Sequence, residues 1–139
     1  MINCKIANVK FRFSLVSNLM KNQLEKYVTN EQGEINISSE IVDKINVPQL
    51  EAKYHSKYYD VYQDNDDLIQ IQKNENNGYI GAVIYKENSA IILMENGDIG
   101  RKEYLLTEYA CLYFILKHEN AILIHSSSIQ YNIFPLSTL

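Results

Sequence analysis

Tryptophan is absent from this chain of 139 residues, and glycine (5), proline (2) and cysteine (2) are scarce. So little glycine and proline excludes a collagen-like or low-complexity protein. The chain also has no run of roughly 20 apolar residues, the length that a membrane-spanning helix needs, so we expect no membrane partner. The N-terminus lacks a continuous apolar segment and a small-residue cleavage site. This predicts no secretory signal and a cytoplasmic location.

Positive charge is in deficit as well. The chain has 13 lysines and arginines against 17 aspartates and glutamates, which gives a net charge of −4. No basic field therefore favours nucleic acid or an anionic membrane, and we expect no nucleic-acid partner. Cys4 and Cys111 lie far apart in apolar stretches. Two buried, unreactive thiols are the favoured interpretation, with a disulfide bond or a reactive thiol as the alternative.

The abundant residue types favour β-strands, since the chain has 18 isoleucines and 11 tyrosines. Short turns with the sequences DNDD, ENNG and ENS separate four strand-like segments, and Asn-Gly is a strong hairpin signal. These four segments predict an antiparallel meander. Alternation of apolar and polar residues predicts strands at residues 2–13, 34–38, 57–63, 68–73, 79–86 and 90–94.

Three segments carry helix signals. Ser17 and Asn18 are typical caps of a short helix, and Ser39 heads a second candidate helix or turn that Pro48 limits. Residues 104–117 are apolar around most of a helix circumference, which predicts a buried helix. Residues 121–131 follow as an apolar core strand. We therefore predict one α+β domain over residues 1–139: an antiparallel β meander with a few helices, in which a buried C-terminal helix precedes a core strand.

One polar cluster interrupts this predicted core strand, where His125 is followed by Ser126, Ser127 and Ser128. Buried polar groups need partners or a solvent-filled cleft. An imidazole beside three hydroxyls suits a metal ligand, a proton shuttle or a phosphate contact. The other interpretation, which the spacing alone favours, is a strand end that emerges into solvent with His125 hydrogen-bonded locally.

Residues 122–132, with the sequence ILIHSSSIQYN, resemble the segment that precedes the phosphate loop in proteins related to HPr kinase and phosphoenolpyruvate carboxykinase. In that group an apolar helix leads to a strand of this type, and a Walker A phosphate loop comes later. The resemblance implies an ATP- and magnesium-handling protein in which His125 contacts the metal or the active-site phosphates. The tight similarity is confined to this segment, and the order of elements resembles the family loosely over most of the chain.

The sequence departs from that family after Asn132, where it reads IFPLSTL. Its five glycines never form the spacing G-x-x-x-x-G-K-[ST], and without this loop a triphosphate lacks its main electrostatic cradle. We therefore expect a non-catalytic N-terminal portion of an HPr-kinase-like protein, truncated before the phosphate loop, with a vestigial His125. No cofactor is expected as it stands, and ATP and magnesium are expected only for a full-length relative. The alternatives are a complete small α+β protein-interaction domain and a still-active nucleotide binder.

Other chemical candidates are less specific. The three histidines are too scattered to predict a zinc site, and DNDD lacks the glycine and glutamate of a calcium loop, so a solvated turn is favoured. A tyrosine cluster could stack bases or form a recognition surface, but a packed sheet face is the preferred interpretation. The cluster comprises Tyr54, Tyr58, Tyr59 and Tyr62.

The expected partners follow from the predicted core strand. Without a neighbouring strand, residues 121–131 would present an unpaired apolar edge, which invites pairing with another copy. We therefore expect a homodimer or higher assembly through residues 121–131 or through the helix at 104–117. A protein or peptide partner is the other expectation.

Overall fold

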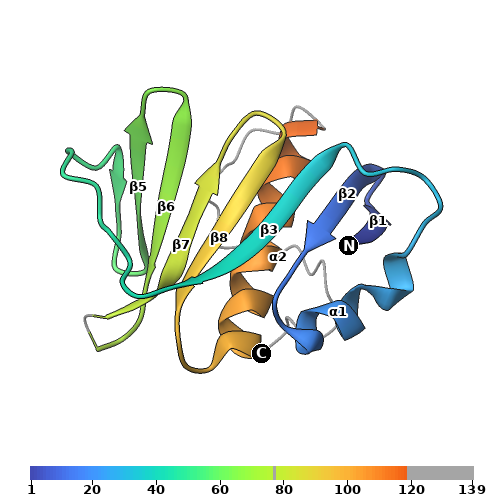
Figure 1. Cartoon of the computed structure of the whole chain (residues 1–139). Helices are drawn as coiled ribbons and strands as arrows, with labels where there is room; N and C mark the ends of the chain where they lie inside the picture. Colours follow the sequence, from blue (N-terminus) through green and yellow to red (C-terminus); the bar gives the residue numbers. More distant parts are fainter. Residues whose placement is uncertain (77, 119–139) are drawn as a thin grey trace.

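The computed structural model describes residues 1–76 and 78–118, which form an eight-stranded mixed sheet with helices packed on one face (Figure 1). The strand order is β1-β2-β3-β8-β7-β6-β5-β4. This confirms the predicted α+β class. The elements are β1 (Ile2–Ile6), β2 (Val9–Ser14), α1 (Asn18–Leu24), the 3₁₀ turn η1 (Glu25–Tyr27), β3 (Ile35–Val42), β4 (Tyr54–His55), β5 (Tyr59–Asp64), β6 (Asp67–Lys73), β7 (Tyr79–Tyr85), β8 (Ser89–Glu95) and α2 (Ile99–His118).

The predicted meander forms one half of the sheet. Strands β5, β6, β7 and β8 pair antiparallel in chain order, joined by the three tight turns. The other half is different, because β3 lies parallel to both β2 and β8. Parallel neighbours need a crossover connection, and α1 with η1 provides it between β2 and β3. Strand patterns in the sequence do not specify which strands pair, so this arrangement was not predicted.

Two predicted boundaries were wrong. Residues 2–13 form two strands, because Ala7 (φ 50°) and Asn8 (φ 67°) make a tight turn in the left-handed region without any glycine. The second candidate helix at Ser39 is instead the continuation of β3 to Val42. There Ser39 pairs in register with Ile92 of β8, and its hydroxyl donates to Glu103 rather than capping a helix. Sheet pairing overrides the local cap signal.

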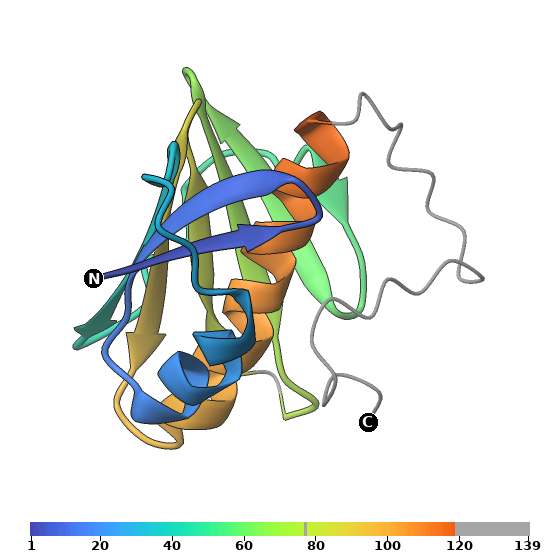
Figure 2. The same cartoon turned by 90° about the vertical axis from the view of Figure 1, so that its right-hand side faces the viewer.

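The predicted short helix and the predicted buried helix are both confirmed. Ser17 caps α1, since its hydroxyl accepts a hydrogen bond from the Leu19 N–H (3.2 Å). α2 begins five residues before the predicted start, at Ile99, and runs along one face of the sheet with α1 beside its first turns (Figure 2). Gly81 permits this close approach, because a Cβ there would lie 2.6 Å from Leu106 Cδ1.

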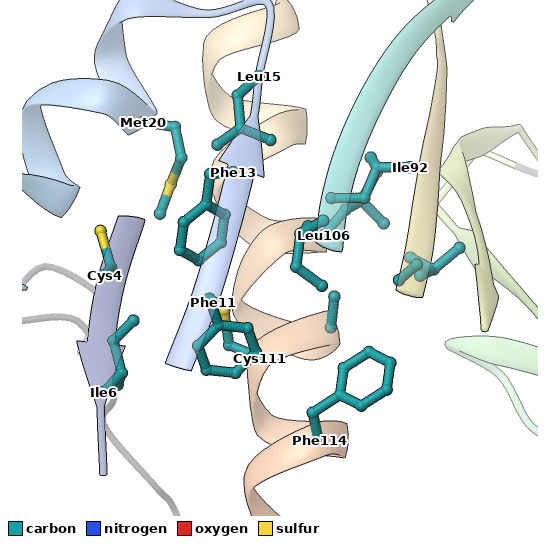
Figure 3. Packing of buried hydrophobic residues seen from close by; sticks show 14 of the residues in the cluster. Cys4, Ile6, Phe11, Phe13, Leu15, Met20, Ile92, Leu106, Cys111 and Phe114 are labelled. Carbon is teal, nitrogen blue, oxygen red and sulfur yellow. The ribbon is translucent and has the colours of Figure 1, made fainter. Parts of the chain in front are cut away.

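The main core lies between α2 and the sheet (Figure 3). Phe11 and Phe13 of β2 stack at 5.6 Å between ring centroids and are fully buried. Cys4 and Cys111 belong to the same core as free thiols, which confirms the buried, unbridged interpretation. Burial raises the pKa of the Cys4 thiol to about 11 and also raises the pKa of Cys111, so both are poor nucleophiles at neutral pH.

A smaller core covers the opposite face of the sheet, where the connection between β3 and β4 crosses the strands of the meander. It consists of Ile45, Tyr62, Ile71 and Ala82. Neither helix in the described part of the chain combines the length and apolar character needed to cross a bilayer. The predicted core strand at residues 121–131 lies outside the described residues.

Candidate functional site

The sequence-predicted site residue, His125, and the serines that follow it lie outside the described residues. The role inferred for His125 from the family resemblance therefore stays a prediction. Within residues 1–76 and 78–118, the side chains best arranged for binding lie elsewhere, at one end of the meander.

Two hairpins border an open cleft of about 720 Å³ at that end of the sheet. We call it the tyrosine cleft. The volume is in the range of small-molecule and peptide sites. The β4–β5 hairpin contributes one wall and the β6–β7 hairpin the other. The lining residues are His55, Ser56, Lys57, Tyr58, Asp60, Gln72, Lys73, Asn74, Glu75, Gly78, Tyr79 and Ile80.

Local hydrogen bonds form between described residues in both hairpins. The Ser56 hydroxyl donates to the Tyr59 carbonyl (2.9 Å) and accepts from the Tyr58 and Tyr59 N–H groups. In the other tip, the Asn74 side-chain oxygen accepts from the Gly78 N–H (2.9 Å). These are the side-chain-to-backbone bonds that serine and asparagine commonly make in turns. Ser56 is thereby committed to the turn and is not arranged as a nucleophile.

Asp60 is the polar centre of the cleft. It precedes Tyr62 by two residues on β5, so its side chain lies on the sheet face opposite α2. One carboxylate oxygen, Oδ1, contacts both His55 Nδ1 (2.5 Å) and Lys73 Nζ (2.8 Å). Lys73 also donates to the Ser56 carbonyl (2.9 Å), which links the two tips. Because Nδ1 of His55 is engaged, Nε2 is the nitrogen left for a ligand.

The pKa of Asp60 lies below its ordinary value of 3.8. Burial raises it, but hydrogen bonds from Lys73 and His55 and their positive charge outweigh that effect. The carboxylate is therefore ionised at neutral pH and neutralises Lys73. The result is a hydrogen-bonded, nearly charge-balanced floor rather than a strongly cationic or anionic site.

Asp60 should contribute to acid sensitivity. Because its pKa is lower in the folded state, its stabilising contribution is present above the ordinary carboxyl pKa and is lost as the pH falls through the lowered folded value. We expect Asp60→Asn to reduce the loss of unfolding free energy below about pH 4. Urea unfolding from pH 5 to pH 2 measures this. The exposed Asp43→Asn is the matched control, and equal acid profiles of wild type and Asp60→Asn would contradict the assignment.

The tyrosines of the predicted cluster divide between two roles. Tyr62 is buried in the smaller core, as a packed sheet face requires. Tyr58 is instead 64% exposed, and Tyr54 is also exposed and stacks on Tyr59 with 5.3 Å between ring centroids. Tyr79, which the sequence did not single out, joins Tyr58 at the cleft. The packed-face prediction is therefore wrong for Tyr58, whereas Tyr54 packs on Tyr59 and stays partly exposed.

The remaining candidates have ordinary surroundings. DNDD closes the β5–β6 hairpin, with Asn65 in the left-handed region and Asp67 bound by Lys86 Nζ (2.9 Å). The described residues contain no group of three His, Cys, Asp or Glu side chains arranged to hold a metal ion.

Sequence reasoning missed the group formed by His55, Asp60 and Lys73. The histidine and aspartate become neighbours because they are cross-strand partners in the β4–β5 hairpin, and β6 brings the lysine beside them. A hairpin predicted over residues 53–62 would have indicated that His55 and Asp60 are neighbours, but the alternation of apolar and polar residues there is too weak to predict one.

Comparisons with known proteins give no further indication. No protein-family model, curated protein or solved structure matches the chain.

Proposed function

We propose that this chain is a non-catalytic protein-binding domain that engages a segment of a partner polypeptide at the tyrosine cleft. Its sequence resembles the N-terminal portion of HPr-kinase-like proteins, and the given residues contain no phosphate loop. A protein-binding role is compatible both with this resemblance and with the alternative of a small α+β interaction domain.

The observation that carries the proposal is the pair of exposed tyrosines, Tyr58 and Tyr79, beside a cleft of about 720 Å³. Tyrosine offers a large apolar ring with a polar end and few rotatable bonds, so it is enriched in protein-recognition surfaces. The Asp60 network fixes the floor of the cleft before any partner arrives. Such preorganisation reduces the entropy lost on binding.

The chemistry of the cleft favours binding over catalysis. The Ser56 hydroxyl is held by three backbone groups, and both cysteines of the chain are buried in the main core. An activated nucleophile needs a base within hydrogen-bond reach of an accessible oxygen or sulfur. His55 has its carboxylate partner, but among the described residues no such nucleophile is placed beside it.

Peptide selection tests the cleft. A random-peptide phage library is selected on the wild-type protein, and the enriched peptides are then titrated against the double variant Tyr58→Ser/Tyr79→Ser. Loss of two aromatic contacts should weaken peptides that occupy the cleft by at least about tenfold, since one such anchor is worth more than about 1 kcal/mol.

The matched control for this experiment is Val28→Ser, an exposed apolar residue beside β1 at the opposite edge of the sheet, which should leave the affinity unchanged. Cooperative urea unfolding shows that each variant is folded. Peptides that bind the double variant as tightly as wild type, or a selection that enriches none, would overturn the proposal.

A titration with ATP separates this function from the nucleotide-binding alternative. Without a phosphate loop, we expect no heat of binding with Mg-ATP at millimolar concentration by isothermal titration calorimetry. A phosphate-loop ATPase under the same conditions is the positive control. Binding in the micromolar range would favour a still-active nucleotide binder instead.

The proposal retains two further expectations, a cytoplasmic location and self-association. Self-association was expected through residues 121–131 or through the helix at 104–117. In the helix, Leu106, Ala110 and Phe114 pack on the sheet, which leaves the half-buried side with Leu105 and Leu112 for a second copy. Light scattering over a range of protein concentrations measures the assembly, and a strictly monomeric species would contradict it.

A further inference from the structure

β3 continues past the end of β2, and this leaves part of an inner strand without a neighbour. The last β2–β3 pair joins Ser14 to Ser38, whereas β3 pairs with β8 through to Val42. In Figure 1, β2 ends while β3 runs on, and the first turns of α2 are seen behind the open place. Among the described strands, residues 40–42 therefore pair with β8 alone.

The orientation of the backbone identifies the groups that face the open side. The Asn36 N–H donates to the Asn88 carbonyl (3.0 Å), so even-numbered residues of β3 direct their N–H and C=O groups toward β8. Odd-numbered residues face β2. The N–H and C=O of Ile41 thus face the open side, and no described residue donates to or accepts from them.

Glu103 binds the chain that follows β2 and directs it away from residues 40–42 of β3. Its carboxylate is fully buried and accepts from the Val16 N–H (3.0 Å), the Ser17 N–H (3.2 Å) and the Ser39 hydroxyl (2.6 Å). These bonds turn the chain away from β3 toward α1 directly after β2. A buried carboxylate without such donors would be strongly unfavourable, so the turn and the open edge are fixed together.

Exposed apolar residues are found on β3 and on the chain that leaves β2. Ile41 is 50% exposed although it lies on an inner strand, and Val16 and Leu19 are nearly as exposed. Val16 also borders a groove of about 480 Å³ that continues toward the start of β1. The lining of this groove comprises Met1, Ile2, Phe13, Ser14, Leu15, Val16 and Lys21. Single exposed apolar residues are ordinary, but several beside an unpaired strand edge form a template for another strand.

We propose that this surface, which we call the β3 notch (Val16, Leu19 and residues 40–42), takes one extended segment of a partner polypeptide, added as a short strand beside residues 40–42 in line with β2. Only an extended backbone complements the free N–H and C=O of Ile41. Alternate side chains of that segment would cover Val16 and Leu19, so the segment should carry apolar residues at every second position.

Within residues 1–76 and 78–118, a second copy of this chain offers no strand edge that fits the notch well. Its β1 edge is already bridged, through Cys4 with Val28 and the Thr29 N–H with the Asn3 carbonyl (3.0 Å), and β4 has two residues. If the notches of two copies faced each other, the ends of both β2 strands would meet at the same place, which disfavours a symmetric dimer there. Because no described strand of a second copy offers a suitable edge, we take a separate peptide segment as the occupant, and pairing through residues 121–131 of a second copy is an outcome of the test. This surface lies on β3 and not on the β4–β7 hairpins, so it is independent of the tyrosine cleft.

The phage selection described above, scored on different variants, tests the notch. Peptides that occupy it should show apolar residues at alternate positions and should bind Ile41→Lys at least tenfold more weakly than wild type. Leu19→Lys is a second variant with the same expectation, and Val28→Lys is the matched control. Tyr58→Ser/Tyr79→Ser should bind these peptides normally, so failure here and failure of the cleft are distinguishable.

Two measurements distinguish strand addition from other contacts. Hydrogen exchange of the Ile41 amide should slow at least tenfold in the complex, and N-methylation of alternate peptide amides should abolish binding, because strand pairing uses those groups. Undiminished binding to Ile41→Lys, unchanged exchange at Ile41 or no enriched peptide of this kind would overturn the proposal. Dimerisation of the free protein that Ile41→Lys abolishes would also overturn it, by assigning the notch to a second copy.

Discussion

Glu103→Ala should lower the free energy of unfolding by about 3–5 kcal/mol, which makes it the most destabilising polar substitution that we expect. The carboxylate is fully buried and satisfies the Val16 and Ser17 N–H groups and the Ser39 hydroxyl. Alanine leaves the Ser17 N–H and the Ser39 hydroxyl without this acceptor in the interior, and the Val16 N–H keeps only the Ser39 hydroxyl oxygen (3.0 Å). Urea denaturation at neutral pH measures the loss.

Two other variants make this test specific to Glu103. Glu103→Gln keeps the shape and one acceptor oxygen but directs an NH₂ group at donors, so an intermediate loss is expected. Arg101→Ala, an exposed position two residues earlier on α2, should change stability by less than about 0.5 kcal/mol. An unfolding free energy of Glu103→Ala within about 1 kcal/mol of wild type would contradict the role assigned to the carboxylate.

Phe11→Ala should produce a loss of similar size, about 3–5 kcal/mol, from a different cause. Phe11 is fully buried on β2, stacks on Phe13 and lies beside Cys111 of α2 (Figure 3). Removing the ring leaves a cavity between the sheet and the helix, which both sides are too constrained to fill. The shift of the urea midpoint at unchanged slope measures it.

Tyr58→Ala is the matched control for Phe11→Ala, because it also removes an aromatic ring but from an exposed position. It should change stability by less than about 0.5 kcal/mol. Equal losses in the two variants would mean that the core between β2 and α2 is not the main source of stability.

The two proposed binding surfaces differ in what holds them in place. At the tyrosine cleft, charged side chains near the surface join two hairpin tips through Asp60. At the β3 notch, a buried carboxylate from α2 fixes the departure of the chain from β2. Salt should therefore weaken the cleft more than the notch, because partly exposed ion pairs are screened and buried hydrogen bonds are not.

Elements with strong local signals were predictable. The serine cap of α1, the three turns of the meander and the nearly all-apolar sequence of α2 each fix a local structure through short-range hydrogen bonds or burial. The turn at Ala7–Asn8 was not predictable, because neither residue is a glycine and the alternation of apolar and polar residues around it is typical of one continuous strand. The extension of β3 to Val42 was missed because Ser39 carries a cap signal that only the pairing with β8 overrides.

Most of the candidate sites depended on contacts between distant residues. His55 and Asp60 meet through hairpin register, Lys73 joins them from β6, and Glu103 reaches Val16 across more than 80 positions of sequence. The amino-acid sequence by itself determined the α+β class, the meander and the buried helix, because these follow from periodicity and turn chemistry within short windows. Tertiary structure alone decided the parallel placement of β3, the cleft and the notch, because strand order and register depend on which distant surfaces bury each other.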